Sequence, residues 1–496
     1  MKRSSGILMP ITALPSPYGI GTLGKAAYQF ADFLCTSGQS YWQILPIGHT
    51  GYGDSPYQAF SAFAGNPYFI DLDTLIEEQL LTKEEVSHLE TQPVQAIDYG
   101  QLFTERYPLL RCAFSRVQNK EKEKIEVFRE KQKAWLEDYA LYMAIKTDKK
   151  GAGWLTWEAE LRERETTCLE KYKTRLEMER RFWVFIQYKF YEQWYKLKKY
   201  VNTLGIQIIG DLPIYVASDS CDVWASEGLF KLDEMRTPYV VAGCPPDAFS
   251  DEGQLWGNPI YDWEVMQKTG YNWWVRRIAS SLKLFDWIRI DHFRGFEAYW
   301  EIPFGETTAI QGEWVKGPGI HLFNKLKEVL GELPIIAEDL GYLTQEVIDL
   351  REATGYPGMK VLQFAFNPQE ESDYMPHSYP THCVVYTGTH DNDTIRGWLE
   401  TTGPKEEVAY AKQYLNLTKE EGYNWGYIRG AWGSVAVLAL TTMQDLLNLG
   451  NESRMNFPST TEGNWGWRMQ SDALNQDLSH HLYQTTKMYG RLPKIS

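Results

Sequence analysis

Cysteine, long apolar runs and basic charge are all in short supply in this sequence of 496 residues. The six cysteines are scattered, with neither the close pairing of a metal site nor a disulfide framework, so we expect a reduced, cytoplasmic protein. No apolar run approaches the roughly 18 residues of a membrane-spanning helix, and the apolar start of the chain is too short for a signal peptide. The formal net charge of −15 argues against nucleic acid and membranes as partners.

Aromatic residues, by contrast, are abundant. They make up 14% of the chain, including 19 Trp and 31 Tyr. A flat aromatic face with a polar edge suits a sugar ring, which is apolar on its faces and hydroxylated at its rim. A neutral sugar also needs no basic pocket, in agreement with the acidic charge balance. Any single aromatic is still more often a packing residue, so composition alone only favours a carbohydrate ligand.

One short stretch places charge directly after an apolar run. Residues 287–290 read Trp-Ile-Arg-Ile, and Asp-His-Phe-Arg-Gly follows. Side chains alternate along a strand, so Arg289 and Asp291 point to the same side. The guanidinium favours the ionised form of the carboxylate, which is the form that a nucleophile requires. A purely structural Arg–Asp pair explains this stretch about equally well.

Three further apolar runs end in a carboxylate. They are residues 205–211, 333–338 and 383–391, which end in Asp211, Glu338 and Asp391. Uninterrupted apolar runs are typical of strands buried on both faces of a parallel sheet. Carboxylates at the carboxyl ends of successive parallel strands are how a (β/α)₈ barrel builds an active site. Because chance hardly supplies four such endings, we predict an α/β protein with a (β/α)₈ TIM barrel.

The chain is longer than a minimal barrel, which needs about 250 residues. We therefore predict one catalytic barrel over residues 1–496 that carries two insertions. A helical insertion is expected over about 66–180, after the second strand, and a lid over about 218–270, after the third. We find no internal repeat and no separate carbohydrate-binding module.

Three segments complete the predicted layout. Residues 243–259 lack helical periodicity, and we expect a long loop there whose Phe249 and Trp256 can cover a ligand. The sixth strand is predicted at 359–364. Residues 435–443 fit either a buried helix or the eighth strand, and counting to eight favours the strand.

Taken together, the motifs resemble one known enzyme family over nearly the whole chain. The family is that of the 4-α-glucanotransferases called amylomaltase or disproportionating enzyme, in glycoside hydrolase family 77. The resemblance rests on residues 51–58, 210–216, 253–259, 289–296, 337–341, 357–366, 389–394 and 454–468. It implies transfer of α-1,4-glucan segments from a donor to glucose or a maltooligosaccharide, without a metal or other cofactor.

The resemblance also implies roles for individual residues. Asp291 corresponds to the nucleophile, Glu338 to the general acid/base and Asp391 to the transition-state stabiliser. Substrate-binding positions are matched by Tyr57, Asp211, Phe249, Trp256, Arg289, His292, His390 and Asn464. A secondary glucan-binding surface is matched by Tyr52 and Tyr99.

Chemical reasoning from the residues agrees with this mechanism. Retaining glycosyl transfer needs two carboxyl groups about 5–5.5 Å apart. Asp291, kept ionised by Arg289, would attack the anomeric carbon. Glu338 would donate a proton to the leaving oxygen, because burial and nearby negative charge raise its pKa and keep it protonated. An α-glucan hydrolase with the same mechanism is the first alternative. A non-catalytic glucan-binding protein is the second, but it requires the loss of one of the three carboxylates, and all are present.

Overall fold

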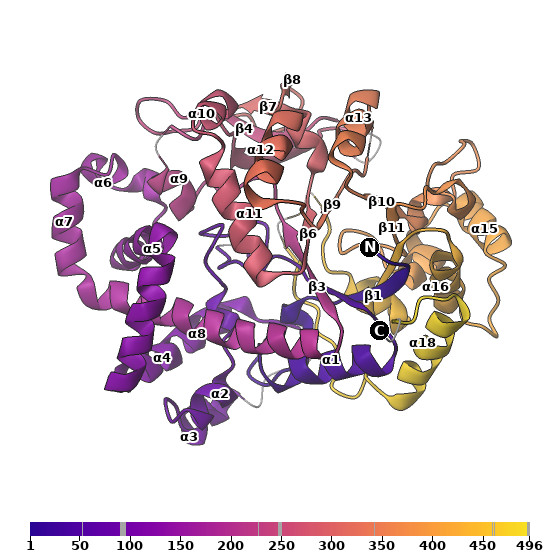
Figure 1. Cartoon of the computed structure of the whole chain (residues 1–496), viewed down its shortest axis with the longest axis horizontal. Coiled ribbons are helices and arrows are strands. Elements are labelled where there is room, and N and C mark those ends of the chain that lie inside the picture. Colours follow the sequence, from indigo (N-terminus) through magenta and orange to yellow (C-terminus); the bar gives the residue numbers. More distant parts are fainter. Residues whose placement is uncertain are drawn as a thin grey trace.

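A barrel of parallel strands forms the centre of the protein (Figure 1), seen here in a computed structural model that describes residues 1–51, 53–89, 96–226, 228–246, 250–341, 343–458, 460 and 462–493. Eight strands pair in the order β10-β11-β12-β1-β2-β3-β6-β9, each parallel to its neighbour. The end strands β9 and β10 approach each other where the Ala337 N–H donates to Pro357 O at 2.9 Å. The nearly closed sheet confirms the predicted barrel. The strands are β1 (Ser4–Leu8), β2 (Tyr41–Gln43), β3 (Gln207–Leu212), β6 (Trp287–Ile290), β9 (Ile335–Ala337), β10 (Gly358–Val361), β11 (Cys383–Tyr386) and β12 (Leu438–Thr442).

The strands are short, apolar and buried on both faces. One apolar cluster joins residues from seven of them, among them Leu8, Ile209, Ile336 and Leu440. Residues that alternate with these, such as Ile208 and Ile288, belong to the larger core beneath the surrounding helices. Burial on both faces removes the alternating pattern of an exposed strand, which is why the runs read as continuous in the sequence. Residues 438–442 form β12, so the preference for a strand there is confirmed.

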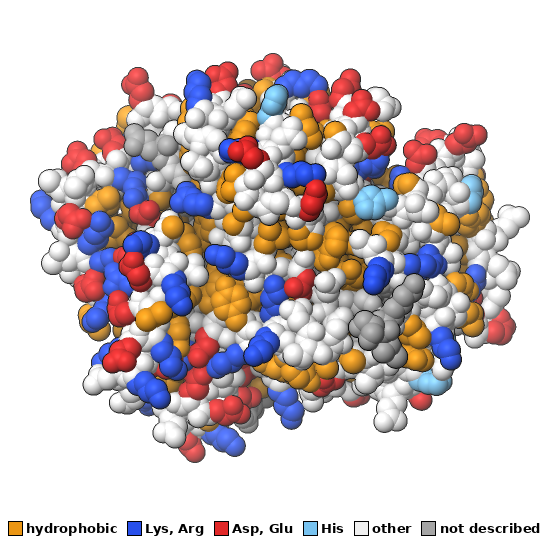
Figure 2. Space-filling model, in the orientation of Figure 1, with side chains coloured by type: hydrophobic (Ala, Val, Ile, Leu, Met, Phe, Trp, Pro, Cys, Tyr) orange, Lys and Arg blue, Asp and Glu red, His pale blue; other side chains and the backbone are white. Residues whose placement is uncertain are grey.

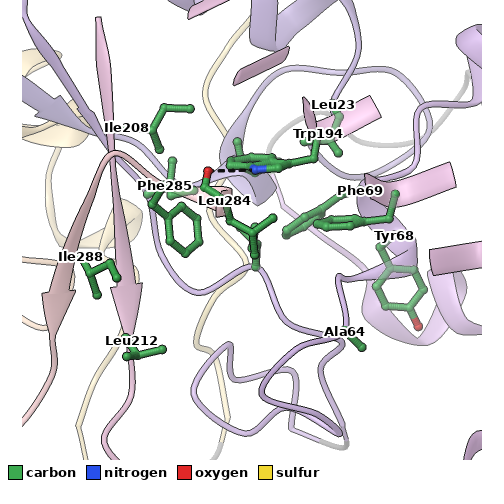
Figure 3. Close-up of a cluster of buried hydrophobic side chains, with 14 of the residues drawn as sticks. Leu23, Ala64, Tyr68, Phe69, Trp194, Ile208, Leu212, Leu284, Phe285 and Ile288 are labelled. Atoms are coloured by element: carbon green, nitrogen blue, oxygen red, sulfur yellow. Dashed lines mark hydrogen bonds between the residues drawn. The ribbon is translucent and has the colours of Figure 1, made fainter. Parts of the chain in front are cut away.

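Helices pack around the barrel and cover its outer face. Figure 3 shows Trp194 of α8 with its indole nitrogen directed at the carbonyl of Leu284, close to Phe285 and Ile208. That N–H donates at 3.0 Å from inside the apolar core. The indole therefore gains apolar burial and keeps its polar group satisfied. The helices around the barrel include α1 (Lys25–Thr36), α8 (Glu177–Thr203), α11 (Asn272–Leu284), α12 (Ile320–Leu330), α13 (Gln345–Thr354), α15 (Lys405–Tyr414), α16 (Tyr423–Gly433), α17 (Met443–Leu446) and α18 (Gln476–Met488).

A group of helices between β2 and β3 stands to one side of the barrel, at the left of Figure 1. Buried polar contacts attach it. His49, from the loop after β2, lies 2.8 Å from the Tyr139 hydroxyl and 2.9 Å from the Tyr107 hydroxyl. Lys189 of α8 contacts three carboxylates at 2.8–3.0 Å. The helices are α2 (Leu72–Glu77), α3 (Lys83–Val86), α4 (Tyr99–Ser115), α5 (Asn119–Asp148), α6 (Ala159–Arg162) and α7 (Thr166–Arg175).

A second sheet, which the sequence analysis did not predict, lies above the barrel. It has four antiparallel strands in the order β5-β4-β7-β8. Because β4 and β5 fall within residues 240–259, the expectation of a strandless loop at 243–259 is wrong. The central partner of β4 is β7, which lies after another barrel strand, so the pairing leaves no local pattern in the sequence. The strands are β4 (Val240–Cys244), β5 (Gln254–Pro259), β7 (Ala298–Pro303) and β8 (Glu313–Lys316), and α9 (Cys221–Ala225) and α10 (Trp263–Lys268) lie nearby in the chain.

Two predicted strands extend too far. The sixth, expected at 359–364, ends at Val361, where a 3₁₀ helix (Leu362–Ala365) begins. The seventh, β11, ends at Tyr386, so Asp391 belongs to the loop beyond it and not to the strand. In this loop Thr389 and Asn392 bond to each other, and the short helix α14 (Ile395–Gly397) follows.

Candidate active site at the carboxyl ends of the barrel strands

The ends of β6 and β9 bring Asp291 and Glu338 side by side. The two strands pair in parallel with Ile290 opposite Ala337, so each carboxylate directly follows a paired residue. Two backbone hydrogen bonds of 3.0 Å continue the pairing, from Glu338 N–H to Ile290 O and from Phe293 N–H to Glu338 O. Neighbouring strands lie about 4.8 Å apart. Both carboxyl groups therefore occupy the same edge of the barrel.

Asp291 shares a single guanidinium with a second carboxylate. Nη1 of Arg289 donates to Asp291 Oδ1 at 3.0 Å and to both oxygens of Asp211 at 2.7 and 2.8 Å. Burial, together with the negative charges of Asp211 and Asp391, outweighs Arg289 and raises the pKa of Asp291 to about 6. Arg289 lowers this pKa, as expected, but burial has the larger effect. Asp291 is still ionised at neutral pH.

Glu338 is oriented by backbone donors. The N–H of His292 donates to Oε2 at 2.6 Å, and the N–H of Leu340 donates to Oε1 at 2.9 Å. The first of these donors comes from a residue with φ of 51°, in the left-handed region. Burial and the negative charge of Asp291 raise the pKa of Glu338 to about 7, as predicted for a general acid. A substantial fraction of Glu338 is therefore protonated near neutral pH.

Asp391 lies in a contrasting environment. Its Oδ2 contacts Nε2 of His390 at 3.2 Å, and its Oδ1 accepts a bond of 2.6 Å from the amide of Asn456. Partial desolvation alone would raise the pKa of Asp391, but these partners outweigh it and lower the pKa to about 2. Asp391 in turn raises the pKa of His390, against the effect of burial. The site thus contains a carboxylate that stays ionised across the physiological range.

One chain of contacts links these groups. The hydroxyl of Tyr57 donates to Asp211 at 2.9 Å and lies 2.8 Å from Nε2 of His390. The rings of Tyr57 and His390 stack with centroids 5.4 Å apart. This series of contacts connects Arg289 at one end with Asp391 at the other, across the top of the barrel. Two carboxyl groups of different proton affinity, with ordered polar side chains beside them, suit acid–base and nucleophilic chemistry on a hydroxylated substrate.

The sequence matches a known family. A profile of glycoside hydrolase family 77, described as 4-alpha-glucanotransferase, matches residues 9–475 of this chain. The chain belongs to the 4-alpha-glucanotransferase family.

Full-length relatives agree with this assignment. The 4-alpha-glucanotransferase of Clostridium butyricum is 53% identical over 485 residues, which are 97% of this chain and 100% of the relative. That of Thermus thermophilus is 49% identical over 503 residues, covering 99% and 100%. The Solanum tuberosum relative, named as chloroplastic/amyloplastic, is 43% identical, covering 99% and 87%. One relative is thus named for a plastid, and the cytoplasmic location of this chain stays a prediction.

A solved structure agrees as well. The amylomaltase of Streptococcus agalactiae, determined in complex with acarbose, is 42% identical and superimposes with a TM-score of 0.97, covering 99% of this chain and 100% of that one. The amylomaltase of Corynebacterium glutamicum, at 17% identity and a TM-score of 0.81, shows the same fold, with 98% and 75% covered. The activity expected from the sequence, 4-α-glucanotransfer, is that of the family.

Within this glucanotransferase, Trp256 of β5 contacts the loop that follows β6. Its ring meets the ring of His292 edge-on, with centroids 4.8 Å apart, and Tyr215 lies 6.3 Å away. His292 is the residue whose backbone holds Glu338. Trp256 therefore lies one residue removed from Glu338, and its covering role stays a prediction. Phe249 and Tyr52, predicted for the lid and the secondary surface, fall outside the described residues.

The polar groups of Tyr99 and Asn464 form hydrogen bonds within the protein itself. The Tyr99 hydroxyl donates to the carbonyl of Trp465 at 3.0 Å. Asn464 accepts from Phe457 N–H at 2.8 Å and donates to Thr460 O at 3.1 Å, closing its own loop. Among the described residues, these bonds do not involve the three carboxylates, and the sugar-binding roles of Tyr99 and Asn464 stay predictions.

Two residues that the sequence did not single out contact Asp391 directly. Asn456 donates to its side chain, and Nη2 of Arg454 donates to its backbone carbonyl at 2.5 Å. Trp465, from the same loop, packs its ring 5.8 Å from Tyr57 and 6.1 Å from His390. The only signal in the sequence is the density of amide, carboxylate and indole groups in residues 454–468, which predicts sugar contact but not these bonds.

The structure also bears on metals and membranes. Across the described residues, no group of three His, Cys, Asp or Glu side chains is arranged to hold a metal ion. In the same part of the chain, no helix combines the length and apolar character needed to cross a bilayer. Figure 2 shows acidic and basic side chains interspersed over one face, so the negative excess is not gathered into one patch there.

Proposed function

We propose that this 4-α-glucanotransferase moves a segment of an α-1,4-glucan to the 4-hydroxyl of glucose or a maltooligosaccharide by retaining double displacement. The observation that carries the proposal is the pairing of Ile290 with Ala337, which sets Asp291 and Glu338 on neighbouring strand ends. Retaining enzymes place the two carboxyl groups about 5–5.5 Å apart, and side chains on adjacent strand ends, whose backbones lie about 4.8 Å apart, are compatible with that arrangement.

In the first half-reaction, an ionised Asp291 attacks the anomeric carbon of the bound donor. The proton of Glu338 passes to the departing glycosidic oxygen, and a covalent glycosyl ester forms on Asp291. The raised pKa of Glu338 supports this role, because a carboxyl of ordinary pKa would rarely hold a proton at neutral pH. The backbone bonds from His292 and Leu340 fix the direction in which that proton is presented.

Asp391 and His390 act on the sugar that carries the developing positive charge. Asp391 keeps its negative charge and has bonds to His390 and Asn456 that orient it. A fixed carboxylate favours an oxocarbenium-like transition state more than the neutral ground state. Tyr57 and Asp211 hold His390 and Arg289 in place. This arrangement supports a role in stabilisation for Asp391, separate from the two residues that make and break bonds.

In the second half-reaction, Glu338 takes the proton of an acceptor 4-hydroxyl, and that oxygen attacks the glycosyl ester. Water would give hydrolysis at the same step, so transfer depends on excluding water and positioning a sugar. Trp256 against His292 supplies an apolar surface at this point. We infer that it lies against the acceptor and favours transfer.

The test combines maltotriose with two isosteric variants. Glu338→Gln should lower the rate of disproportionation on the order of 10²–10⁴-fold. With an α-maltosyl fluoride donor, whose leaving group needs no acid, it should accumulate a maltosyl adduct on the Asp291 peptide by mass spectrometry. Asp291→Asn should form no such adduct. The control is Glu332→Gln, an exposed carboxylate ahead of the same strand, which should behave as the parent.

Product analysis separates the possible outcomes. Transfer from maltotriose yields glucose with a ladder of longer chains, whereas hydrolysis yields glucose and maltose only. An adduct on another residue, or near-normal disproportionation by Asp291→Asn, would refute the assigned roles. A hydrolytic product pattern in the parent enzyme would refute glucan transfer, and complete inactivity of the parent would favour a binding protein.

A further inference from the structure

The barrel does not by itself fix the position of Asp391. Its strand, β11, ends at Tyr386, and the intervening loop carries the carboxylate away from the sheet. Asp291 and Glu338, in contrast, follow their strands directly and are held by the ladder between them. A transition-state stabiliser must be held within a fraction of an ångström. Another part of the molecule therefore has to hold this loop.

The segment that follows β12 does so through two residues. Asn456 Nδ2 donates to Asp391 Oδ1 at 2.6 Å, and Asn456 N–H donates to His390 O at 3.1 Å. Arg454 Nη2 donates to Asp391 O at 2.5 Å, and its Nη1 pairs with Asp393. The residues of this segment are also joined to each other, since Nε of Arg454 donates to Asn456 O at 2.7 Å.

The segment is itself held in place by an apolar cluster and by a backbone hydrogen bond. Met455, between the two polar residues, is 2% exposed and packs in an apolar cluster with Leu45 and Trp465. Its carbonyl accepts from Trp465 N–H at 2.7 Å. The Trp465 ring then lies over Tyr57 and His390. Asn456 thus presents its amide from a rigid base.

We propose that Arg454 and Asn456 form a clamp that orients Asp391 for catalysis, with Asn456 as the positioning residue for its carboxylate and Arg454 for its backbone. The inference rests on the proposed role of Asp391 as transition-state stabiliser. Asn456 engages Oδ1 and His390 engages Oδ2, so each oxygen has one protein partner and keeps a lone pair for a sugar hydroxyl.

The chemistry of the amide explains why asparagine suits this position. The groups facing Asp391 are His390 and Tyr57 beside it, Arg289 and Asp291 across the site, and Arg454 at its backbone. A further cation would neutralise the carboxylate, and a further acid would repel it. A neutral N–H donor orients the charge and favours the ionised form without cancelling it.

The test uses an isosteric change, Asn456→Asp, beside Asn456→Ala. Both remove the donor, and the first adds a like charge. A lost bond to a charged group corresponds to a decrease in kcat of roughly 10- to 100-fold, with KM for maltotriose little changed. Because the pKa of Asp391 lies at about 2, well below that of Asp291, the acid limb of the kcat–pH profile should stay in place in Asn456→Ala. The added negative charge of Asn456→Asp should move it to higher pH. Asn475→Ala, which removes the amide that caps α18, is the matched control and should change thermal stability only.

Three results decide the inference. A kcat, KM and acid limb that match the parent in both Asn456 variants would overturn it. A raised KM with kcat unchanged, or a loss of kcat that disappears when the assay is run well below the lowered thermal midpoint, would also overturn it, because either would indicate a structural role only. Failure of the proposed function is distinguished by Asp391→Asn, since that variant would then remain active whatever the Asn456 variants do. With the clamp in place, Asp391→Asn and Asn456→Ala together should lose no more than Asp391→Asn alone.

Discussion

Replacing Arg289 by methionine should affect both stability and the pH dependence of the reaction. The Arg289 side chain is 4% exposed and that of Asp211 is fully buried, with 2.7 Å between the charged groups. Breaking a buried ion pair from one side destabilises a protein by about 3–5 kcal/mol, because the remaining charge is uncompensated. With an unfolding entropy of about 2.1 cal/mol/K per residue, the whole chain has about 1 kcal/mol/K. We therefore expect the thermal midpoint to fall by about 3–5 °C.

The pH dependence has a definite sign. Burial already raises the pKa of Asp291 from its ordinary 3.8 to about 6, and Arg289 opposes that rise. Without Arg289 the pKa rises further, so the acid limb of kcat/KM should move to higher pH. A carboxyl whose folded pKa lies above its unfolded value stabilises the fold below the unfolded pKa and loses that contribution as pH rises through the folded pKa. The stability deficit of Arg289→Met should accordingly be larger at about pH 8 than at about pH 5.

The assay is circular dichroism at a fixed heating rate, combined with glucose release from maltotriose across pH. Arg351→Met is the matched control, because Arg351 pairs with buried Asp339 at 2.6 Å and not with Asp291. It should lower the midpoint and leave the acid limb in place. Adding Asp211→Asn to Arg289→Met should restore most of the midpoint. A double variant that unfolds no later than the single one, or an unmoved acid limb in Arg289→Met, would refute the reasoning.

Two further predictions concern the cover and the helical insertion. Trp256→Ala should shift the products of maltotriose from longer chains toward maltose, since water gains access beside His292. An unchanged transfer-to-hydrolysis ratio, measured by chromatography, would show that Trp256 does not exclude water from the site. Lys189→Met, which leaves three carboxylates around a side chain that is 2% exposed, should lower the thermal midpoint by about 3 °C, from about 3 kcal/mol, with kcat unchanged. Lys189 outweighs burial and lowers the pKa of Glu121 from 4.5 to about 2. The stability lost in Lys189→Met should therefore become smaller as pH falls from about 4.5 to about 2, because the protonated Glu121 no longer needs its partner. A loss of stability that grows over this pH range would contradict the ion-pair explanation.

The sequence by itself determined the barrel and two of its three carboxylates. Strands that are buried on both faces appear in the sequence as uninterrupted apolar runs. A charged residue directly after such a run therefore lies at the carboxyl end of the strand, where the barrel opens to solvent. Asp291 and Glu338 could be placed this way because each directly follows its strand. These features depend on residues that are adjacent in the chain.

The tertiary structure decided whatever depends on residues far apart in the chain. Asp391 is placed by Asn456 and Arg454 from beyond another strand, and no local pattern records that contact. The pKa of Asp291 depends on a guanidinium shared with Asp211, which only the pairing of β3 with β6 brings near. Likewise, β4 became a strand because β7, from a later segment, completes its ladder. Hydrogen bonds and charges act through space, whereas sequence periodicity reports only the environment of neighbouring residues.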